Sequence, residues 1–236
     1  MERVSERTLE EMIAYYRARA AEYDEWFYRQ GRFDRGPAAN ARWVAEAETV
    51  FAALDALRPT GDVLELAPGT GIWTERLIRT AHTVTAVDAS PEMVALNRAK
   101  VCSDAVSYVL ADLFAWSPEV SYDAVVFAFW LSHIPHERLD AFLAMVAAAV
   151  RPGGTVFFVD GRREPLGTAA DHRLPEVDAQ VMTRRLNDGR AFQIVKTFHD
   201  PTTLAVRCAA AGLDVAVRET PTYFLYGCGT RRPSSL

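Results

Sequence analysis

The chain has 236 residues, of which half are hydrophobic, with 26 Lys and Arg against 31 Asp and Glu and a formal net charge of −5. This length suits one large domain with a sizeable core, and the acidic balance argues against a nucleic-acid substrate. No stretch approaches the ~20 apolar residues of a membrane-spanning helix. The three cysteines, Cys102, Cys208 and Cys228, show no paired or metal-like spacing and the charged start of the chain shows no signal peptide, so we expect a cytoplasmic protein.

Residues 1–60 are expected to form an N-terminal helical cap. Tyr16, Tyr23 and Phe27 fall on one helical face, within a cluster of aromatic side chains. Such a face either packs the helix onto the body of the protein or shields a ligand from water.

An apolar run leads into a glycine-containing turn, since residues 63–71 read VLELAPGTG. We expect a buried strand at 62–67 and a helix over 71–80. Gly69 and Gly71 let the backbone approach a ligand, and free N–H groups at the helix start favour an anionic group. The next strand ends in Asp88, whose carboxylate can accept hydrogen bonds from a ribose diol. These features predict a nucleotide-type pocket.

The middle of the chain alternates strands and helices. Predicted strands lie at 62–67, 83–88, 106–110, 122–129 and 155–160, and predicted helices at 71–80, 91–101 and 136–151. This alternation predicts a parallel sheet with helices on both faces and ligands at the carboxyl ends of the strands.

The end of the chain contains an insertion and the closing elements. Val177, Val181 and Leu186 predict an amphipathic helix that closes over the pocket, and residues 191–196 predict a short strand. A helix over 201–211 and strands at 213–219 and 222–228 follow.

The glycine turn does not fit a dinucleotide-binding loop, because it lacks the three glycines of G-x-G-x-x-G: Ala67 stands at the first glycine position of the turn, and Thr74 stands three residues after Gly71. With four later motifs it resembles the class I S-adenosylmethionine (SAM)-dependent methyltransferases. In order, the motifs are ELAPGTG at 65–71, VDASPEM at 87–93, AD at 111–112, YDAVV at 122–126 and VRPGG at 150–154. The alternative is a doubly wound domain that binds no SAM.

The resemblance implies a single α/β domain with a Rossmann-like, seven-stranded sheet that is mostly parallel and has an antiparallel edge hairpin. The expected parts are the helical cap at 1–60, the SAM-binding core at 61–160, a substrate-side insertion at 161–199, and the closing helix and strands at 200–236.

The resemblance also implies cofactor roles. Glu65 would orient the loop and reach the methionine amino group, Asp88 would hold the ribose, and Asp112 would accept a hydrogen bond from the adenine amino group. Met93 and Ala89 would pack on the adenine. The other expected cofactor-binding residues are Tyr16, Ala67, Gly69, Gly71, Leu113 and Phe129. Two alternatives stay open: Asp112 caps its own turn, and Met93 is a core residue.

Methyl transfer is an in-line displacement in which the protein positions the acceptor and, for a hydroxyl or ring nitrogen, removes a proton. His133 is the expected base, unless it only holds structure. Arg162 and Arg163 belong, with Arg184, to a local excess of arginine. These side chains either contact an anionic acceptor or the cofactor carboxylate, or are solvated or paired with nearby acids. The expected substrate-binding residues are Tyr15, Trp26, Trp130, Arg162, Arg163 and His199.

We therefore expect an enzyme that methylates an oxygen or nitrogen of a small molecule and releases S-adenosylhomocysteine (SAH). We expect a monomer or homodimer with no metal, nucleic-acid or membrane partner. A SAM-binding protein that does not methylate, and a methyltransferase acting on RNA or protein, are the alternatives.

Overall fold

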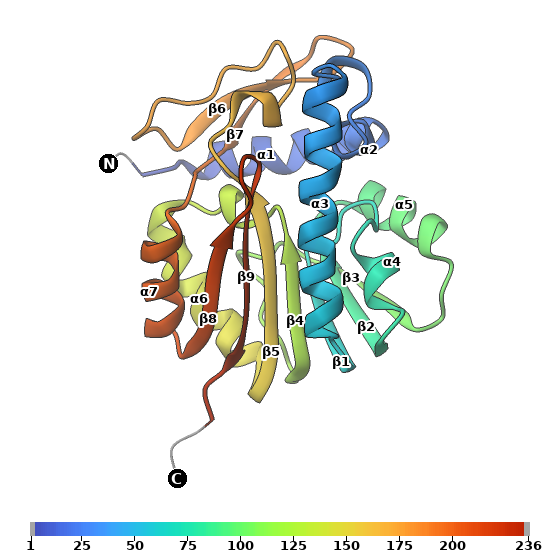
Figure 1. Ribbon diagram of the computed structural model, residues 1–236, viewed down its shortest axis with the longest axis vertical. Coiled ribbons are helices and arrows are strands. Elements are labelled where there is room, and N and C mark those ends of the chain that lie inside the picture. Colours follow the sequence, from blue (N-terminus) through green and yellow to red (C-terminus); the bar gives the residue numbers. More distant parts are fainter. Residues whose placement is uncertain (1–2, 234–236) are drawn as a thin grey trace.

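The computed structural model describes residues 3–233. A seven-stranded sheet of order β3-β2-β1-β4-β5-β9-β8 forms its centre (Figure 1). The strands are β1 (Gly61–Leu66), β2 (Ala81–Asp88), β3 (Val106–Leu110), β4 (Tyr122–Ala128), β5 (Val150–Gly161), β8 (Leu213–Glu219) and β9 (Phe224–Arg231). The first five pair in parallel, and β9 pairs antiparallel with both β5 and β8. The predicted sheet with its antiparallel edge is confirmed.

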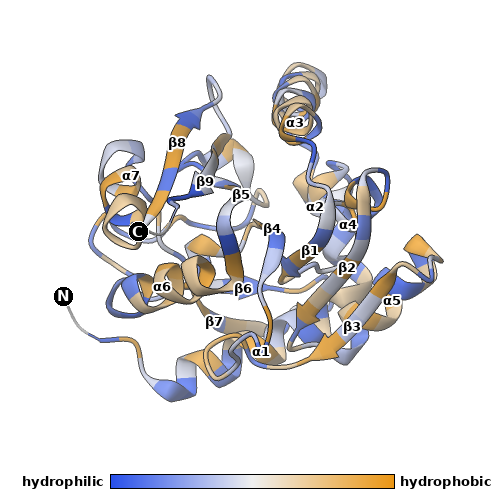
Figure 2. Ribbon diagram, turned by 90° about the horizontal axis from the view of Figure 1, so that it is seen from below, coloured by the Kyte–Doolittle hydropathy of each residue, from blue (hydrophilic) through white to orange (hydrophobic). Residues whose placement is uncertain are grey.

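Helices cover both faces of this sheet (Figure 2). One face carries α3 (Pro37–Leu57), α4 (Thr74–Leu77) and α5 (Pro91–Val101), and the other carries α6 (Leu139–Ala149) and α7 (Pro201–Ala210). Because successive side chains along a strand point to opposite faces, the sheet contributes side chains to two separate hydrophobic cores, one on each face. Phe127 and Phe158 pack under α6, whereas Phe157 packs with Trp43 on the α3 face.

The beginning of the chain and the insertion lie together over the carboxyl ends of the parallel strands (Figure 1). Here α1 (Glu6–Arg19), η1 (Ala20–Glu22) and α2 (Tyr23–Phe27) sit beside a two-stranded hairpin, β6 (Val181–Arg185) and β7 (Ala191–Val195). Leu9, Met12 and Tyr15 of α1 pack against Ile194 and Val195 of β7. Short 3-10 turns complete the fold: η2 (Gly31–Phe33), η3 (Leu131–His133), η4 (His136–Arg138) and η5 (Pro165–Gly167).

Several predicted elements need correction. The helix expected from Val177 to Leu186 is wrong: Val177 lies exposed in a loop, and β6 alternates buried and exposed residues with the period of a strand. The helix expected over 71–80 shortens to α4, and the one over 136–151 divides into η4 and α6. β5 begins at Val150, before the glycine pair.

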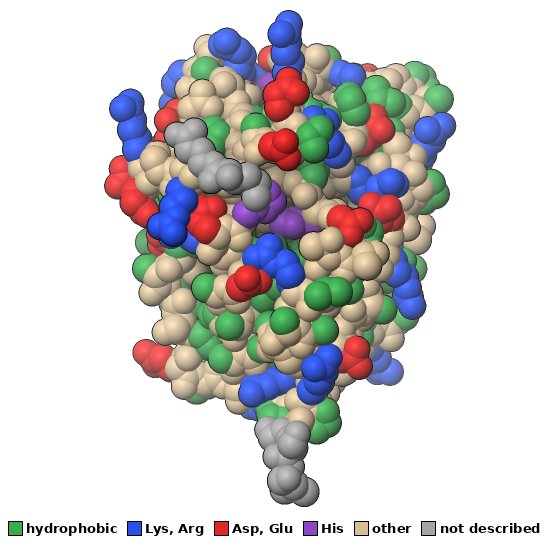
Figure 3. All heavy atoms as spheres, turned by 90° about the vertical axis from the view of Figure 1, so that its left-hand side faces the viewer, with side chains coloured by type: hydrophobic (Ala, Val, Ile, Leu, Met, Phe, Trp, Pro, Cys, Tyr) green, Lys and Arg blue, Asp and Glu red, His purple; other side chains and the backbone are tan. Residues whose placement is uncertain are grey.

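Within residues 3–233, no helix combines the length and apolar character that crossing a bilayer requires. On the face shown in Figure 3, Lys and Arg side chains are interspersed with Asp and Glu.

Candidate active site

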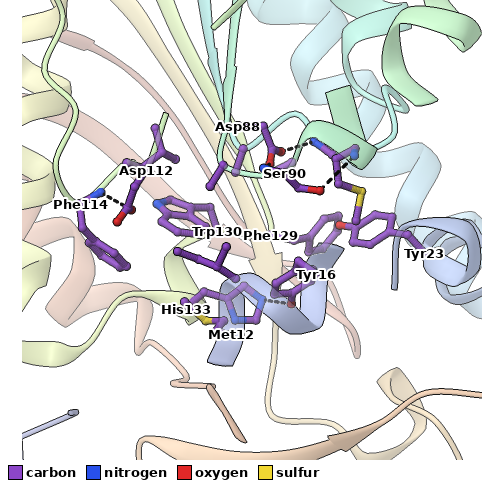
Figure 4. A pocket seen from close by; sticks show the side chains of 17 residues that line it. Met12, Tyr16, Tyr23, Asp88, Ser90, Asp112, Phe114, Phe129, Trp130 and His133 are labelled. Atoms are coloured by element: carbon purple, nitrogen blue, oxygen red, sulfur yellow. Dashed lines mark hydrogen bonds between the residues drawn. The ribbon is translucent and has the colours of Figure 1, made fainter. Parts of the chain in front are cut away.

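A cavity of about 670 Å³, counting its open mouth, lies at the carboxyl ends of the strands beneath α1 (Figure 4). We call it the first cavity. It is lined by Tyr16, Ala67, Gly69, Asp88, Ala89, Met93, Asp112, Leu113 and Phe129, all predicted cofactor residues. Residues of several sequence motifs, far apart along the chain, therefore line one cavity at the carboxyl ends of the strands.

Two non-glycine residues of the cavity wall have left-handed backbone conformations. Ala67 has φ 52° and Phe129 has φ 56°, and they follow β1 and β4 directly. The Ala67 N–H donates to Val87 O (2.9 Å) and the Phe129 N–H donates to Val159 O (2.7 Å), so both strands stay paired up to the bend. Such strained conformations cost roughly 1–3 kcal/mol each and persist where surrounding structure imposes them, most often at functional sites.

Asp88 anchors the loop and faces the cavity. Its Oδ2 accepts the Gly69 N–H (3.2 Å) and its Oδ1 accepts the Ser90 N–H (2.9 Å). Burial raises the pKa of this carboxyl, which these N–H groups oppose. A carboxylate has about four lone-pair sites, so Asp88 can still accept hydrogen bonds from a ligand diol.

The positions of Asp112 and Met93 are compatible with both roles that the sequence left open. Asp112 Oδ1 accepts the Phe114 N–H (2.9 Å), which caps the local turn, and Asp112 also lines the first cavity (Figure 4). Met93 is buried like a core residue and still contributes to the cavity wall. Structural and ligand-binding roles are therefore compatible at both positions.

Glu65 lies below the loop and is not part of the cavity lining. Its Oε2 accepts the Thr74 hydroxyl (2.6 Å), while Asn97 Nδ2 donates to Thr74 Oγ1 (2.9 Å) and to Gly69 O (3.2 Å). Burial raises the pKa of Glu65 to about 8, against the Thr74 hydrogen bond and with help from Asp88. The carboxyl thus orients the loop from beneath; its contact with a ligand stays a prediction.

Gly71 also lies outside the cavity lining, so its contact with a ligand stays a prediction. It has φ 97°, and a Cβ there would lie 3.0 Å from the Asn97 side chain and 3.1 Å from Val101. Glycine is needed here for packing the loop against α5. Asn97, which the sequence did not single out, joins this loop to α5 and accepts a hydrogen bond from Tyr108 (2.8 Å).

Polar contacts tie the beginning of the chain to the rim of the first cavity. Lys100 Nζ donates to Asp24 Oδ2 (2.6 Å), and the Thr70 hydroxyl donates to Asp24 Oδ1. Arg17 pairs with Glu92 at the start of α5 (3.1 Å). These contacts hold α1 and α2 across the glycine loop, so this part of the predicted cap covers the cavity.

A second cavity, of about 590 Å³ counting its mouth, lies between α1, the β6–β7 hairpin and the end of the sheet. Four side chains line both cavities: Tyr16, Tyr23, Phe129 and His133. A group bound in one cavity therefore lies next to a group bound in the other.

Three buried cations line the second cavity. Arg19 Nη2 and Arg184 Nε are buried without a hydrogen-bond partner, and neither guanidinium forms an ion pair within the part of the chain that the structure describes. Arg184 Nη1 donates to Thr168 Oγ1 (2.8 Å), and Lys196 lies 3.5 Å from Asp160. Buried charges are costly unless compensated, so this wall is suited to an anion.

His133 and Tyr16 form a pair at the boundary between the cavities. His133 Nδ1 lies 2.8 Å from the carbonyl oxygen of Val195, so Nδ1 carries the proton. Nε2 then accepts the Tyr16 hydroxyl (2.7 Å; Figure 4). Burial, with the charge of Lys196, lowers the pKa of His133 to about 3, so the ring is neutral near pH 7 and its lone pair is used by Tyr16.

Three of the predicted substrate-binding residues reach a cavity. Trp26 and Arg162 line the second cavity, and Trp130 lines the first. Trp26 Nε1 donates to Gly167 O (2.9 Å), and Arg162 pairs with Glu219 (3.0 Å). Arg162 is therefore already neutralised, unlike Arg19 and Arg184.

Tyr15, Arg163 and His199 line neither cavity. Tyr15 is fully buried in the contact between α1 and β7, Arg163 donates to the Pro175 carbonyl, and His199 Nε2 lies 3.2 Å from Leu131 O. These side chains support the walls. The cavity cations Arg19 and Lys196 were not singled out from the sequence, because each lies far along the chain from the motifs.

Residues 63–154 match the family model described as a methyltransferase domain. A ubiquinone biosynthesis O-methyltransferase of Xanthomonas campestris pv. campestris is 31% identical over 162 residues, 66% of this chain and 64% of that protein. The chain thus spans slightly less than two thirds of that curated relative.

Two solved structures match almost the whole chain. A complex of DhpI with SAH has a TM-score of 0.80 and 38% identity, covering 98% of this chain and 100% of that one. A DhpI–SAM–HEP complex has a TM-score of 0.77 and 40% identity, covering 95% and 99%. With the motifs and the sheet order, these matches show that the chain belongs to the class I SAM-dependent methyltransferases.

Proposed function

We propose that this methyltransferase binds SAM in the first cavity and methylates an oxygen or nitrogen of an anionic small molecule held in the second. The observation that carries the proposal is the meeting of the two cavities at Tyr16, Tyr23, Phe129 and His133. The DhpI structures, one described with SAH and one with SAM and HEP, support the cofactor assignment.

The residues of the first cavity suit SAM. Asp88 would accept hydrogen bonds from the ribose hydroxyls, and Asp112 would accept one from the adenine amino group. Bound SAM supplies an electrophilic methyl group on a sulfonium. The aromatic faces of Tyr16 and Phe129 favour a cation at the boundary between the cavities.

The second cavity favours an anionic acceptor. Arg19 and Arg184 line it, and each has a buried nitrogen without a hydrogen-bond partner. Lys196 provides a third cation, beside one acid, Glu164. A carboxylate or an oxyanion of phosphorus or sulfur would use these donors and offset the cost of burying the charges. Fixing that group would aim the rest of the acceptor at the shared boundary, and such orientation can contribute much of the rate.

We further propose that His133 holds the Tyr16 hydroxyl at this boundary. The imidazole is neutral and hydrogen-bonded at both nitrogens, so it acts on a ligand through Tyr16 or after Tyr16 moves. Removal of a proton by His133 stays a prediction, and a His133 variant tests it below.

Two alternatives differ in a measurable way. A SAM-binding protein that does not methylate would form no SAH with any acceptor. A protein or RNA methyltransferase would have to bring its target into the second cavity, which is covered by α1 and the β6–β7 hairpin.

The proposal is tested with pairs of hydroxyl or amine compounds that differ only by an anionic group. SAH formation is measured for each pair at matched concentrations. We expect turnover of anionic members and far less of their neutral partners; equal turnover within pairs would reject the role of the cations. Tight SAM binding without SAH formation in any pair would favour a protein that does not methylate.

A further inference from the structure

Asp160 is a buried acid at the carboxyl end of β5, and no role proposed above uses its carboxylate. Its Oδ2 accepts the Ser132 N–H (2.8 Å), and its Oδ1 accepts the Gly161 N–H (2.7 Å). Oδ1 also lies 3.5 Å from Lys196 Nζ, with only 2% of the Asp160 side chain exposed. A charge so deeply buried requires a partner, and Lys196 is the cation that faces it.

Lys196 connects Asp160 to the second cavity. It follows β7, lines the second cavity, and donates from Nζ to Ser132 Oγ (2.6 Å). The next residue is fixed to the same turn, because the Thr197 N–H donates to Ser132 O (2.8 Å). An ammonium has three donors; Ser132 and Asp160 engage two, so one remains for a ligand in the cavity.

We propose that Asp160 is a positioning residue for methyl transfer, which holds the charged ammonium of Lys196 at the wall of the second cavity for the anionic group of the acceptor. This inference rests on the proposed function. Asp160 itself is not part of the cavity lining, so it acts through Lys196.

The electrostatic surroundings explain why the carboxylate is needed. Burial lowers the pKa of Lys196, whereas Asp160 raises it. Without this carboxylate the ammonium would face cations and lose its proton at a lower pH. The charged and titratable groups that influence Lys196 or are influenced by it are Asp160 on β5, Arg184 on β6, Arg19 on α1, His133 on η3 and His199 before α7.

The test variant is Asp160→Asn, which removes the charge at nearly constant volume. kcat/KM for an anionic acceptor is measured between about pH 6 and pH 10, around the titration range of a perturbed lysine. In the wild type, kcat/KM should fall at high pH as Lys196 loses its proton; we call this fall the alkaline limb. In D160N we expect the alkaline limb to lie about one pH unit or more lower, which is the shift in pKa that an opposite charge at this distance produces. The Kd for SAM should not change. An alkaline limb that stays in place in a folded variant would overturn the proposal.

Three further variants separate positioning from a general effect on structure. Asp160→Glu keeps the charge, so its alkaline limb should lie close to that of the wild type. Lys196→Arg carries a cation that does not titrate in this range, so the limb should vanish, with or without D160N. Asp140→Asn, at an exposed acid paired with Arg207, is the matched control and should keep the wild-type profile.

Thermal melts establish whether D160N folds. If it does not, wild type and K196R decide: a limb present only in the wild type supports the proposal, and the same limb in both overturns it.

NMR of the lysine side chains follows the titration of Lys196 in the absence of SAM and acceptor. The Lys196 signal is the one that is missing in K196R. An unchanged Lys196 pKa in D160N would overturn the inference even if methyl transfer is active. A lowered pKa without turnover of any acceptor would reject the proposed function and, with it, the role of Asp160 in methyl transfer, while the coupling itself would stand.

Discussion

Replacing Asp88 by alanine tests the assignment of the first cavity. The carboxylate accepts the N–H groups of Gly69 and Ser90 and keeps lone pairs for the ribose hydroxyls. Hydrogen bonds to a charged group contribute ~1.5–3 kcal/mol each. Loss of two ribose bonds, partly replaced by water, should cost about 2–4 kcal/mol, which is a roughly 30- to 700-fold weaker Kd for SAM and SAH.

Calorimetric titration with SAH gives the Kd of the wild type and of Asp88→Ala directly. The matched control is Asp104→Ala, at an exposed acid in the turn before β3. Thermal melts without ligand identify any loss of stability from the Gly69 and Ser90 contacts. A folded Asp88→Ala protein that binds SAH as tightly as the wild type would refute the ribose assignment.

Three other substitutions test separate parts of the site. Arg184→Met should raise KM for an anionic acceptor by about 10- to 100-fold at constant SAM Kd, from the loss of one charged donor; an unchanged KM in initial-rate assays would contradict this. His133→Ala should lower kcat with SAM affinity nearly intact. Because the pKa of His133 is about 3, protonation of His133 should not reduce the kcat of the wild type between about pH 7 and pH 5. A fall in kcat over this range that is absent from H133A would contradict this expectation. Glu65 has a raised pKa of about 8, so its contribution to stability is present below about pH 4.5 and lost as the pH rises to 8; melts of the ligand-free protein should show this loss in the wild type and not in Glu65→Gln.

Local sequence patterns were sufficient for the sheet and for most of the first cavity. The apolar run before the glycine turn and the acid ending the next strand indicated that Gly69 and Asp88 lie beside one cavity, because adjacent parallel strands bring their carboxyl ends together. Their contacts with the cofactor stay predictions. Spacing was ambiguous in the insertion, where Val177, Val181 and Leu186 suggested a helix but packing against α1 produces the β6–β7 hairpin.

The sequence indicated some residues of the second cavity, such as Trp26 and Arg162. It did not indicate which cations form the charged wall, because they come from distant elements. Arg19 on α1, Arg184 on β6 and Lys196 after β7 meet only through tertiary packing. Burial also changes the pKa that a residue type alone would predict. His133 suggested a base with a pKa near neutrality, whereas the structure buries it between Tyr16 and Val195.

The most direct test of the central claim is a crystal structure of the protein with SAH. We predict the ribose hydroxyls within hydrogen-bond distance of Asp88 and the sulfur at the boundary formed by Tyr16 and Phe129, with the second cavity left for the acceptor. SAH bound away from Asp88, or occupying the cavity lined by Arg19 and Arg184, would contradict the account.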